Sequence, residues 1–349
     1  MSLLPAFLGP PRSQFASTSF IYEAIHHPVT VLITFLHYLI LYLRGPSYKP
    51  PVPSKTKPSI RVVCISDTHS KIPPATLPKG DILIHAGDLT NSGSRAQIQQ
   101  TVDWLKSLQK PWPGSSDGYM HIVVVCGNHD AYLDERSRSA HDKAYKNQTL
   151  SWGKIHYLQH SSVTLSFLDG RKLKIYGAPQ IPRCGGKDFA FQYERGQDAW
   201  TDTVPDDADV LVTHNPPKWH LDLATSGGLG DEFELQEIWR TKPTLQVCGH
   251  VHSGYGKEYL WWDKAQKLFE EVREHAYGNG KGQFTQTPLV ELLDISLYIK
   301  GMRVIWEDLK GLAWSRLWGG ARQGTILVNA ALTRQTTNQL GNKPQVVLL

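Results

Sequence analysis

Five apolar runs along the chain each end in a short polar fragment, and this pattern constrains the fold more than any other feature. The runs are bounded by Gly, Pro, Asn and Asp, which is typical of strands buried on both faces. We expect these strands at Ile60 to Ile65, Ile82 to Ala86, Ile122 to Cys126, Asp209 to Val212 and Leu245 to Cys248. Ligands bind outside the carboxyl ends of strands in an open α/β sheet, so the fragments that follow the runs can converge on one crevice.

The fragments supply the side chains that bind divalent cations. They are Asp67-Thr68-His69, Gly87-Asp88, Gly127-Asn128-His129-Asp130, Thr213-His214 and Gly249-His250-Val251-His252. Two cations held ~3.5–4 Å apart need a shared anionic ligand to offset their repulsion. Asp88 is the expected bridge. One site would be completed by Asp67, His69 and His252, and the other by Asn128, His214 and His250.

Such a centre predicts a hydrolytic reaction. A water shared by two cations would be acidified from a pKa of ~15.7 towards neutrality, which gives a hydroxide for in-line attack on phosphorus. His129 directly follows Asn128 and is not needed as a metal ligand. We expect it to act as the general acid for the leaving oxygen or as a stabiliser of phosphoryl charge.

Each fragment alone also has an ordinary structural explanation. An isolated Asp-x-His is usually a turn with a surface histidine, and Gly-Asp is common as a plain turn. Two imidazoles that flank one residue at a strand end, as in Gly-His-x-His, have few structural uses. The five fragments together, in this order, therefore favour a metal centre.

The ordered set D-x-H, G-D, G-N-H-D, T-H and G-H-x-H resembles the calcineurin-like metallophosphoesterase superfamily. The resemblance implies an α/β (α+β) fold in which a sandwich of two mixed sheets is flanked by helices. It also implies a dinuclear centre of Mn, Fe, Zn or Mg. Residues 213–217 and 249–256, with Asn329 on a late strand, are similar to the branch of metallophosphoesterase-domain proteins and cyclic-nucleotide phosphodiesterases. The resemblance covers about Pro58 to Leu349, apart from one insertion.

Two departures from the motifs of Ser/Thr protein phosphatases narrow the expected class of substrate. Ser/Thr protein phosphatases of this superfamily place an Arg before Gly-Asn-His-Glu and carry Asp-Arg-Gly after Gly-Asp. This chain has Cys126 before Gly127, and Leu89-Thr90-Asn91 after Asp88. A protein phosphatase is therefore not expected. The resemblance to the branch above implies hydrolysis of small phosphate esters, most of all phosphodiesters such as cyclic nucleotides. Residues 179–196 and 218–222 are expected at the rim of the cleft.

Composition indicates an ordinary globular enzyme. The net charge of +5 over 349 residues is modest, and no basic run is interleaved with aromatic residues, so no nucleic acid polymer is expected as a partner. The four cysteines lack zinc-ribbon spacing, and three follow or lie within predicted strands, which favours a reducing compartment over a disulfide framework. We expect one catalytic domain over residues 58–349.

Residues 1–57 form a different kind of segment. Val29 to Leu43 carries no Asp, Glu, Lys or Arg, but it is short for a helix that crosses a membrane, which needs ~20 apolar residues. It can be a membrane anchor or a helix packed on the domain. A Pro-rich linker follows it. Positive charges after the run outnumber those before it, which would place the enzyme on the cytoplasmic side if the run spans.

A helical insertion is expected at about 257–323, directly after the last histidine pair. Trp261, Ala265, Leu268 and Val272 recur at helical spacing, and 289–318 is a second helical region too charged to span a membrane. Five of the chain's 11 Trp lie in the insertion. Trp and basic residues beside an apolar face suit a membrane surface, but a cap over the domain or a dimer contact fits equally well.

Two functions remain compatible with the sequence. The first is an active phosphoesterase that uses two divalent metal ions. The second is a catalytically weak adaptor or membrane-associated binding protein that keeps the fold. The complete ligand set favours the enzyme, because a chain released from catalysis would usually lose one of the ligands.

Overall fold

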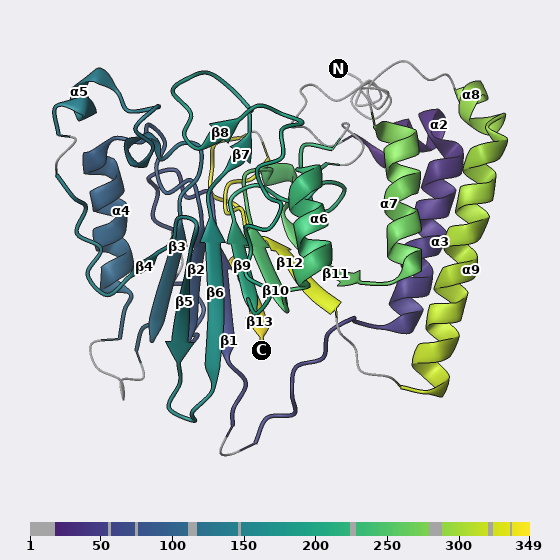
Figure 1. Cartoon of the computed structure of the whole chain (residues 1–349), viewed down its shortest axis with the longest axis horizontal. Coiled ribbons are helices and arrows are strands. Elements are labelled where there is room, and N and C mark those ends of the chain that lie inside the picture. The colour runs from purple at the N-terminus through teal and green to yellow at the C-terminus, as the bar shows by residue number, and fades with distance from the viewer. Residues whose placement is uncertain are drawn as a thin grey trace, which may run out of the picture.

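Two β-sheets pack face to face at the centre of the computed structural model (Figure 1). The structure describes residues 18–54, 57–73, 76–110, 117–145, 148–223, 228–278, 288–319, 324–335 and 337–349. The first sheet has the order β13 (Gln345–Leu348), β1 (Arg61–Ile65), β2 (Ile82–Ala86), β3 (His121–Val125) and β4 (His156–Tyr157). The second has the order β11 (Gly256–Trp261), β12 (Gly324–Asn329), β10 (Leu245–Cys248), β9 (Val210–Thr213), β6 (Lys172–Ala178) and β5 (Ser161–Ser166).

The five predicted strands are confirmed, and they are parallel within each sheet. β1 pairs with β2 and β2 with β3, while β9 pairs with β10. The edge strands β13, β11 and β5 are antiparallel to their neighbours, whereas the edge strand β4 is parallel to β3. The parallel arrangement brings the carboxyl ends of the site-bearing strands to one end of the sandwich. A short ribbon of β7 (Ile181–Pro182) and β8 (Gln192–Tyr193) lies above that end (Figure 1).

The main hydrophobic core fills the space between the two sheets. It contains Val62 and Ile84 from the first sheet and Val212, Val247 and Val328 from the second, all at most 1% exposed. Each such side chain contributes about 1.5–3 kcal/mol when it is fully buried. Rigid strands therefore support the loops at their carboxyl ends.

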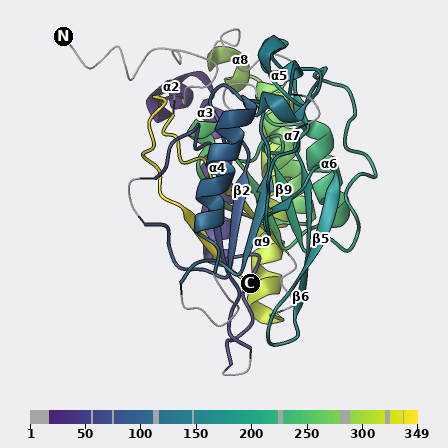
Figure 2. The same ribbon diagram turned by 90° about the vertical axis from the view of Figure 1, so that its left-hand side faces the viewer.

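Helices cover the outer faces of both sheets. α4 (Arg95–Ser107) packs on the first sheet through Ile98, Val102 and Leu105 (Figure 2). The hydroxyl of Ser94 accepts a hydrogen bond from the Gln97 N–H at the start of this helix. α6 (Glu232–Thr241) covers the second sheet through Ile238. Short turns of helix lie in the connections, at α5 (Ala140–Lys143), Ala131–Leu133 and His252–Gly254.

A separate group of helices stands at the far side of the second sheet (Figure 1). It consists of α2 (Phe20–His26), α3 (Pro28–Arg44), α7 (Lys264–Tyr277), α8 (Pro288–Leu292) and α9 (Ile295–Leu317). Its core joins Val29 and Ile33 of α3 to Phe269 of α7 and to Leu297 and Val304 of α9. The N-terminal segment and the insertion, distant in sequence, thus share one small core.

The structure corrects the boundary of the helical insertion. Residues 256–261 form β11, which pairs antiparallel with β12, whereas a helical region was expected from about 257. The alternating exposure of Lys257 to Leu260 follows the period of two residues that a strand requires. The helical part begins only at Lys264.

The expected apolar helix forms as α3, and it packs against α7 and α9. His37 on α3 lies buried against Asp308 of α9, with 2.7 Å between His37 Nδ1 and Asp308 Oδ2. Among the described residues, no helix is both long and apolar enough to cross a membrane. Of the two alternatives for this segment, α3 matches the helix packed on the domain. A cytoplasmic-facing location stays a prediction.

A buried ion cluster joins the helical group to the rest of the domain. His220 is fully buried, with Nδ1 3.3 Å from a Glu258 oxygen and Nε2 3.2 Å from a Glu270 oxygen. Trp239 of α6 donates a 2.9 Å hydrogen bond to Glu270, and Tyr38 of α3 donates one of 3.1 Å to Glu258. His220 is thus part of this cluster and does not line the site cavity described below, although its segment was expected at the rim.

We expect His220→Gln to destabilise the protein at neutral pH and to have a smaller effect at alkaline pH. Burial lowers the pKa of His220, but the two carboxylates outweigh this effect and raise the pKa to about 9. The stabilisation is therefore full below the unfolded pKa of about 6.5 and is lost as the pH rises through about 9, a shift that corresponds to about 3 kcal/mol.

Chemical denaturation of the native protein and the variant between about pH 6 and pH 9.5 measures this effect. The variant His160→Asn, at an exposed position, is the matched control and should behave like the native protein. A stability gap between native protein and His220→Gln that stays constant over this range would contradict a charged His220.

Candidate metal centre

Six of the seven predicted ligands meet at the carboxyl ends of the strands in three overlapping groups, together with His129, which was expected to act in proton transfer and not as a ligand. The groups are Asp67 with His69 and His252, His69 with Asp88 and His129, and Asp88 with His214 and His250. Within each group the ligand atoms lie within 4.8 Å of one another. The structure therefore brings together the residues that sequence reasoning assigned to each of two cation sites.

Asp88 stands between the ligands of the two expected cation sites. Its Oδ2 lies 3.8 Å from His69 Nε2, and its Oδ1 lies 3.4 Å from His214 Nε2. Asn128 Oδ1 is 3.0 Å from the same His214 nitrogen, which places the amide on the side of His214 and His250. The two oxygens of one carboxylate thus face opposite halves of the centre, as a bridging ligand requires.

Asp67 belongs to the first half of the centre. Its Oδ1 is 3.3 Å from His252 Nε2, and His252 Nε2 is 3.3 Å from His69 Nε2. The Asp67 carboxylate also accepts hydrogen bonds from the Ser66 hydroxyl at 2.5 Å and from the His250 N–H at 3.1 Å. These donors fix the carboxylate and connect β1 to the loop that carries the last histidine pair.

Backbone carbonyls orient three of the imidazoles. The Nδ1 atoms of His214, His252 and His129 lie 2.9, 2.9 and 2.8 Å from the carbonyl oxygens of Ala86, Gln335 and Asn91. A carbonyl only accepts, so each Nδ1 carries the proton and donates it. In His214 and His252 this leaves the Nε2 lone pair for a cation, which is the usual arrangement around metal-binding histidines.

The backbone of the ligand-bearing loops is strained. Asp67, His69, Asp88 and His250 have φ values of 53°, 46°, 53° and 61°, in the left-handed region that residues with a Cβ rarely adopt. Glycines stand at the closest approaches. A Cβ at Gly249 would collide with the Asp67 carboxylate, and one at Gly87 would collide with the His214 ring. Such strain clusters at functional sites because the surrounding structure enforces it.

Electrostatics keep both carboxylates charged. Burial alone would raise the pKa of Asp67 and of Asp88, but the hydrogen bond and charge of His252 lower the former, and the charge of His214 lowers the latter. Burial likewise lowers the pKa of His214, yet Asp88 outweighs it and raises that pKa to about 9. A cation bound here would thus displace a proton from the His214 ring.

The donor set fits divalent metals. Imidazole nitrogens, carboxylate oxygens and one amide oxygen suit Zn, Fe and Mn, while Mg prefers a set richer in oxygen. Asp67, Asp88, Asn128 and His214 are each at most 2% exposed. Burial of two charged carboxylates is unfavourable, and coordination of cations offsets this cost.

A cavity of about 250 Å³ opens over the centre. Apart from the predicted site residues His69, Asp88, Asn128, His129, His250 and His252, it is lined by Cys184, Phe189 and Gln335. The first two come from the loop expected at the rim. The Phe189 ring lies 4.8 Å from the His129 ring, centroid to centroid.

Sequence reasoning missed two supporting residues. The Asp130 carboxylate accepts hydrogen bonds from the N–H groups of Leu89, Thr90 and Gly127, which ties the loop after β2 to the loop after β3. The Asn329 amide donates to the carbonyls of Gly249 and Val251. Asp130 is the last residue of the Gly127-Asn128-His129-Asp130 fragment, and this position was the only sequence signal for its role.

Comparisons with known proteins identify relatives of this chain. A family model described as calcineurin-like phosphoesterase matches residues 60–254, which include every predicted site residue. The metallophosphoesterase domain-containing protein 1 of Homo sapiens is 33% identical over 217 residues, which cover 56% of this chain and 61% of that protein. A UPF0046 protein of Caenorhabditis elegans is 32% identical over 210 residues, which cover 56% of this chain and 70% of that protein.

Two further matches differ in extent. The probable rhamnogalacturonate lyase C of Emericella nidulans is 36% identical over 274 residues, 78% of this chain but only 23% of that protein. The chain thus spans about a quarter of that lyase and about three fifths of the human protein. The crystal structure of TT1561 of Thermus thermophilus aligns with 58% of this chain and 85% of its own, at 14% identity and a TM-score of 0.38. The family model spans more than half of the chain, which therefore belongs to the calcineurin-like phosphoesterase family.

Proposed function

We propose that the protein is a metal-dependent phosphoesterase with a dinuclear centre and that it hydrolyses phosphodiesters. The position of Asp88 carries this proposal, because its two oxygens face His69 on one side and His214 on the other. Asp67 and His252 would complete one cation site, and Asn128 and His250 the other. Two bound cations would supply an activated water and polarise the phosphoryl oxygens.

His129 is the group that the chain offers for proton transfer. Its Nδ1 proton is held by the Asn91 carbonyl, so Nε2 can carry a proton to the leaving oxygen. Its ring stands 4.9 Å from the His69 ring, centroid to centroid, beside the first half of the centre. An ester held over the centre would thus have the leaving group next to His129.

The charge of the cavity supports a diester over a monoester. The described residues that line it include no Lys or Arg. A phosphodiester carries one negative charge at neutral pH and a monoester nearly two, and the dianion usually needs such side chains to be held. Phe189 adds an aromatic surface beside His129, which suits the base of a cyclic nucleotide.

Hydrolysis of bis-p-nitrophenyl phosphate and of p-nitrophenyl phosphate, measured after chelation and return of Mn, tests the proposal. We expect the diester to be hydrolysed with the higher kcat/KM and cyclic nucleotides to be opened to monoesters. A fully metal-loaded protein that hydrolyses neither compound would instead indicate a binding protein that has kept the fold.

A further inference from the structure

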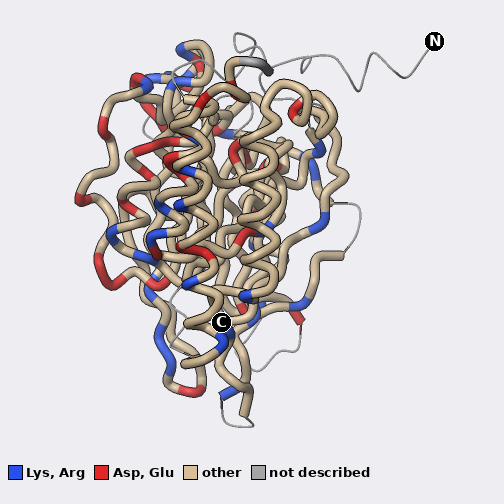
Figure 3. Tube along the Cα trace, turned by 90° about the vertical axis from the view of Figure 1, so that its right-hand side faces the viewer, with Lys and Arg blue, Asp and Glu red and all other residues tan. Residues whose placement is uncertain are grey.

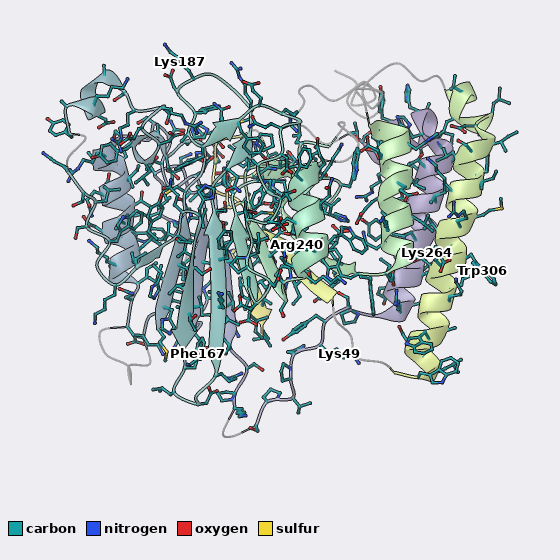
Figure 4. All side chains as sticks on the ribbon, in the orientation of Figure 1. Lys49, Phe167, Lys187, Arg240, Lys264 and Trp306 are labelled. Atoms are coloured by element: carbon teal, nitrogen blue, oxygen red, sulfur yellow. The ribbon has the colours of Figure 1, made fainter. Side chains whose placement is uncertain are left out.

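The outermost helix of the molecule, α9, presents an apolar stripe to the solvent. The stripe repeats at three- and four-residue spacing from Ile295 through Ile299, Met302 and Trp306 to Leu309, and Leu317 continues it two turns further along the helix. Met302, Trp306 and Leu317 are 65%, 63% and 72% exposed. Trp306 lies on the outer side of α9, away from the sheets (Figure 4). A surface helix normally turns its apolar stripe inward, so this orientation needs a partner.

The opposite face of α9 is already occupied. Leu297, Gly301, Val304 and Asp308 are its buried positions, and a Cβ at Gly301 would meet the side chain of Ile33 on α3. α9 therefore has two apolar faces, and only one is used by the fold.

α3 adds a second exposed apolar stripe to the same helical group. Its members are Leu32, Phe35, Leu39, Tyr42 and Leu43, and Tyr42 is 83% exposed. The helix carries one charged residue, Arg44, which is buried. Isolated exposed apolar residues are common, but extended patches of this kind mark interaction surfaces.

The acidic side chains of α8 and α9 face inward. Glu291 is 2% exposed and accepts hydrogen bonds from the Val29 N–H and the Thr30 hydroxyl, and Asp308 is paired with His37. The side chain of Glu307 is 14% exposed and is paired with Lys264 and Lys310.

Three basic side chains of α9 face outward, whereas Lys300 contacts His275 of α7. Arg303, Lys310 and Arg316 are exposed beside the apolar stripe, and every exposed charged residue of α8 and α9 is basic. The charged positions of this side of the molecule can be followed in Figure 3. An occupant of the surface should therefore be apolar at its centre and negatively charged around it.

We propose that the exposed apolar stripe of α9 forms a docking surface for an anionic membrane, with α9 lying along the lipid interface. Trp306, Trp314 and Trp318 are exposed on α9, and Trp favours the headgroup level of a bilayer. Apolar side chains enter the interface while flanking Arg and Lys side chains meet anionic headgroups. The association is peripheral and independent of the hydrolytic reaction.

Flotation with liposomes tests this surface. We expect the full-length protein to float with phosphatidylcholine vesicles that contain about 30% phosphatidylserine and to float less at high salt, because salt screens the basic contacts. The double variant Met302→Glu/Trp306→Glu should bind at least roughly 100-fold more weakly, because two carboxylates replace two inserting side chains.

The matched control is Leu168→Glu, which makes the same change at an 82% exposed position on the hairpin between β5 and β6. It should bind vesicles like the native protein. Arg303→Gln should weaken binding about five-fold on phosphatidylserine vesicles and leave binding to pure phosphatidylcholine unchanged. Circular dichroism verifies that all variants are folded.

Three results would overturn the proposal. They are native protein that stays with the soluble fraction at low salt, a folded double variant that floats as well as native protein, and a solution dimer that the double variant converts to a monomer. The last result would assign the stripe to a second copy of the chain.

Discussion

Replacement of Asp88 by alanine should empty both cation sites and lower the rate of phosphoester hydrolysis on the order of 10³-fold or more. Asp88 is the ligand whose two oxygens face both halves of the centre, so its loss leaves two cations without the charge that offsets their repulsion. Metal ions contribute several kcal/mol to such reactions, and each 1.36 kcal/mol is a factor of ten in rate.

Metal content by mass spectrometry and kcat/KM on a diester are the two measurements. Asp103→Ala is the matched control, because Asp103 is an exposed aspartate on α4 that pairs with Lys106. The control should keep both metals and full activity. An Asp88→Ala protein that retains two metals and most of its turnover would rule out a bridging role.

His129→Ala should separate proton transfer from metal binding. A general acid contributes roughly 10²–10⁴-fold, and least when the leaving group is already a weak base. We therefore expect nearly normal metal content, a loss in that range on alkyl or nucleoside esters, and a smaller loss on p-nitrophenyl esters.

The ratio of the two losses is the informative quantity. His160→Asn, the exposed histidine used above as a control, should change neither rate. Equal losses on nucleoside and p-nitrophenyl esters would contradict the acid role and point to stabilisation of phosphoryl charge by His129.

The convergence of the candidate ligands was predictable because its sequence signal is local. Each ligand directly follows a buried strand, and parallel pairing of β1, β2 and β3 turns that sequence pattern into proximity. The left-handed backbone of Asp67 and Asp88 carries no such signal, because only the assembled loops enforce it. The role of Asp130 depends on backbone N–H groups whose positions only the fold defines.

The helical group was harder to predict because its sequence signals are ambiguous. An uncharged run such as Val29 to Leu43 has the same composition whether it meets lipid or protein, and Phe269 and Val304, far along the chain, decide the outcome. The strand β11 is short and adjoins residues with helical spacing, so its pairing with β12 decides its conformation. His220 lies in a segment expected at the rim of the cleft, but it is buried and paired with carboxylates from β11 and α7.

We infer that Asp67, Asp88 and their partner side chains hold two metal ions that support the hydrolysis of phosphoesters. Titration of the chelator-treated protein with Mn²⁺, followed at once by electron paramagnetic resonance and by hydrolysis of a diester, tests it most directly. We predict two Mn²⁺ per chain, a spin-coupled spectrum, and activity that rises with the coupled species. Activity that is complete at one Mn²⁺ per chain, or two uncoupled ions without hydrolysis, would contradict the account.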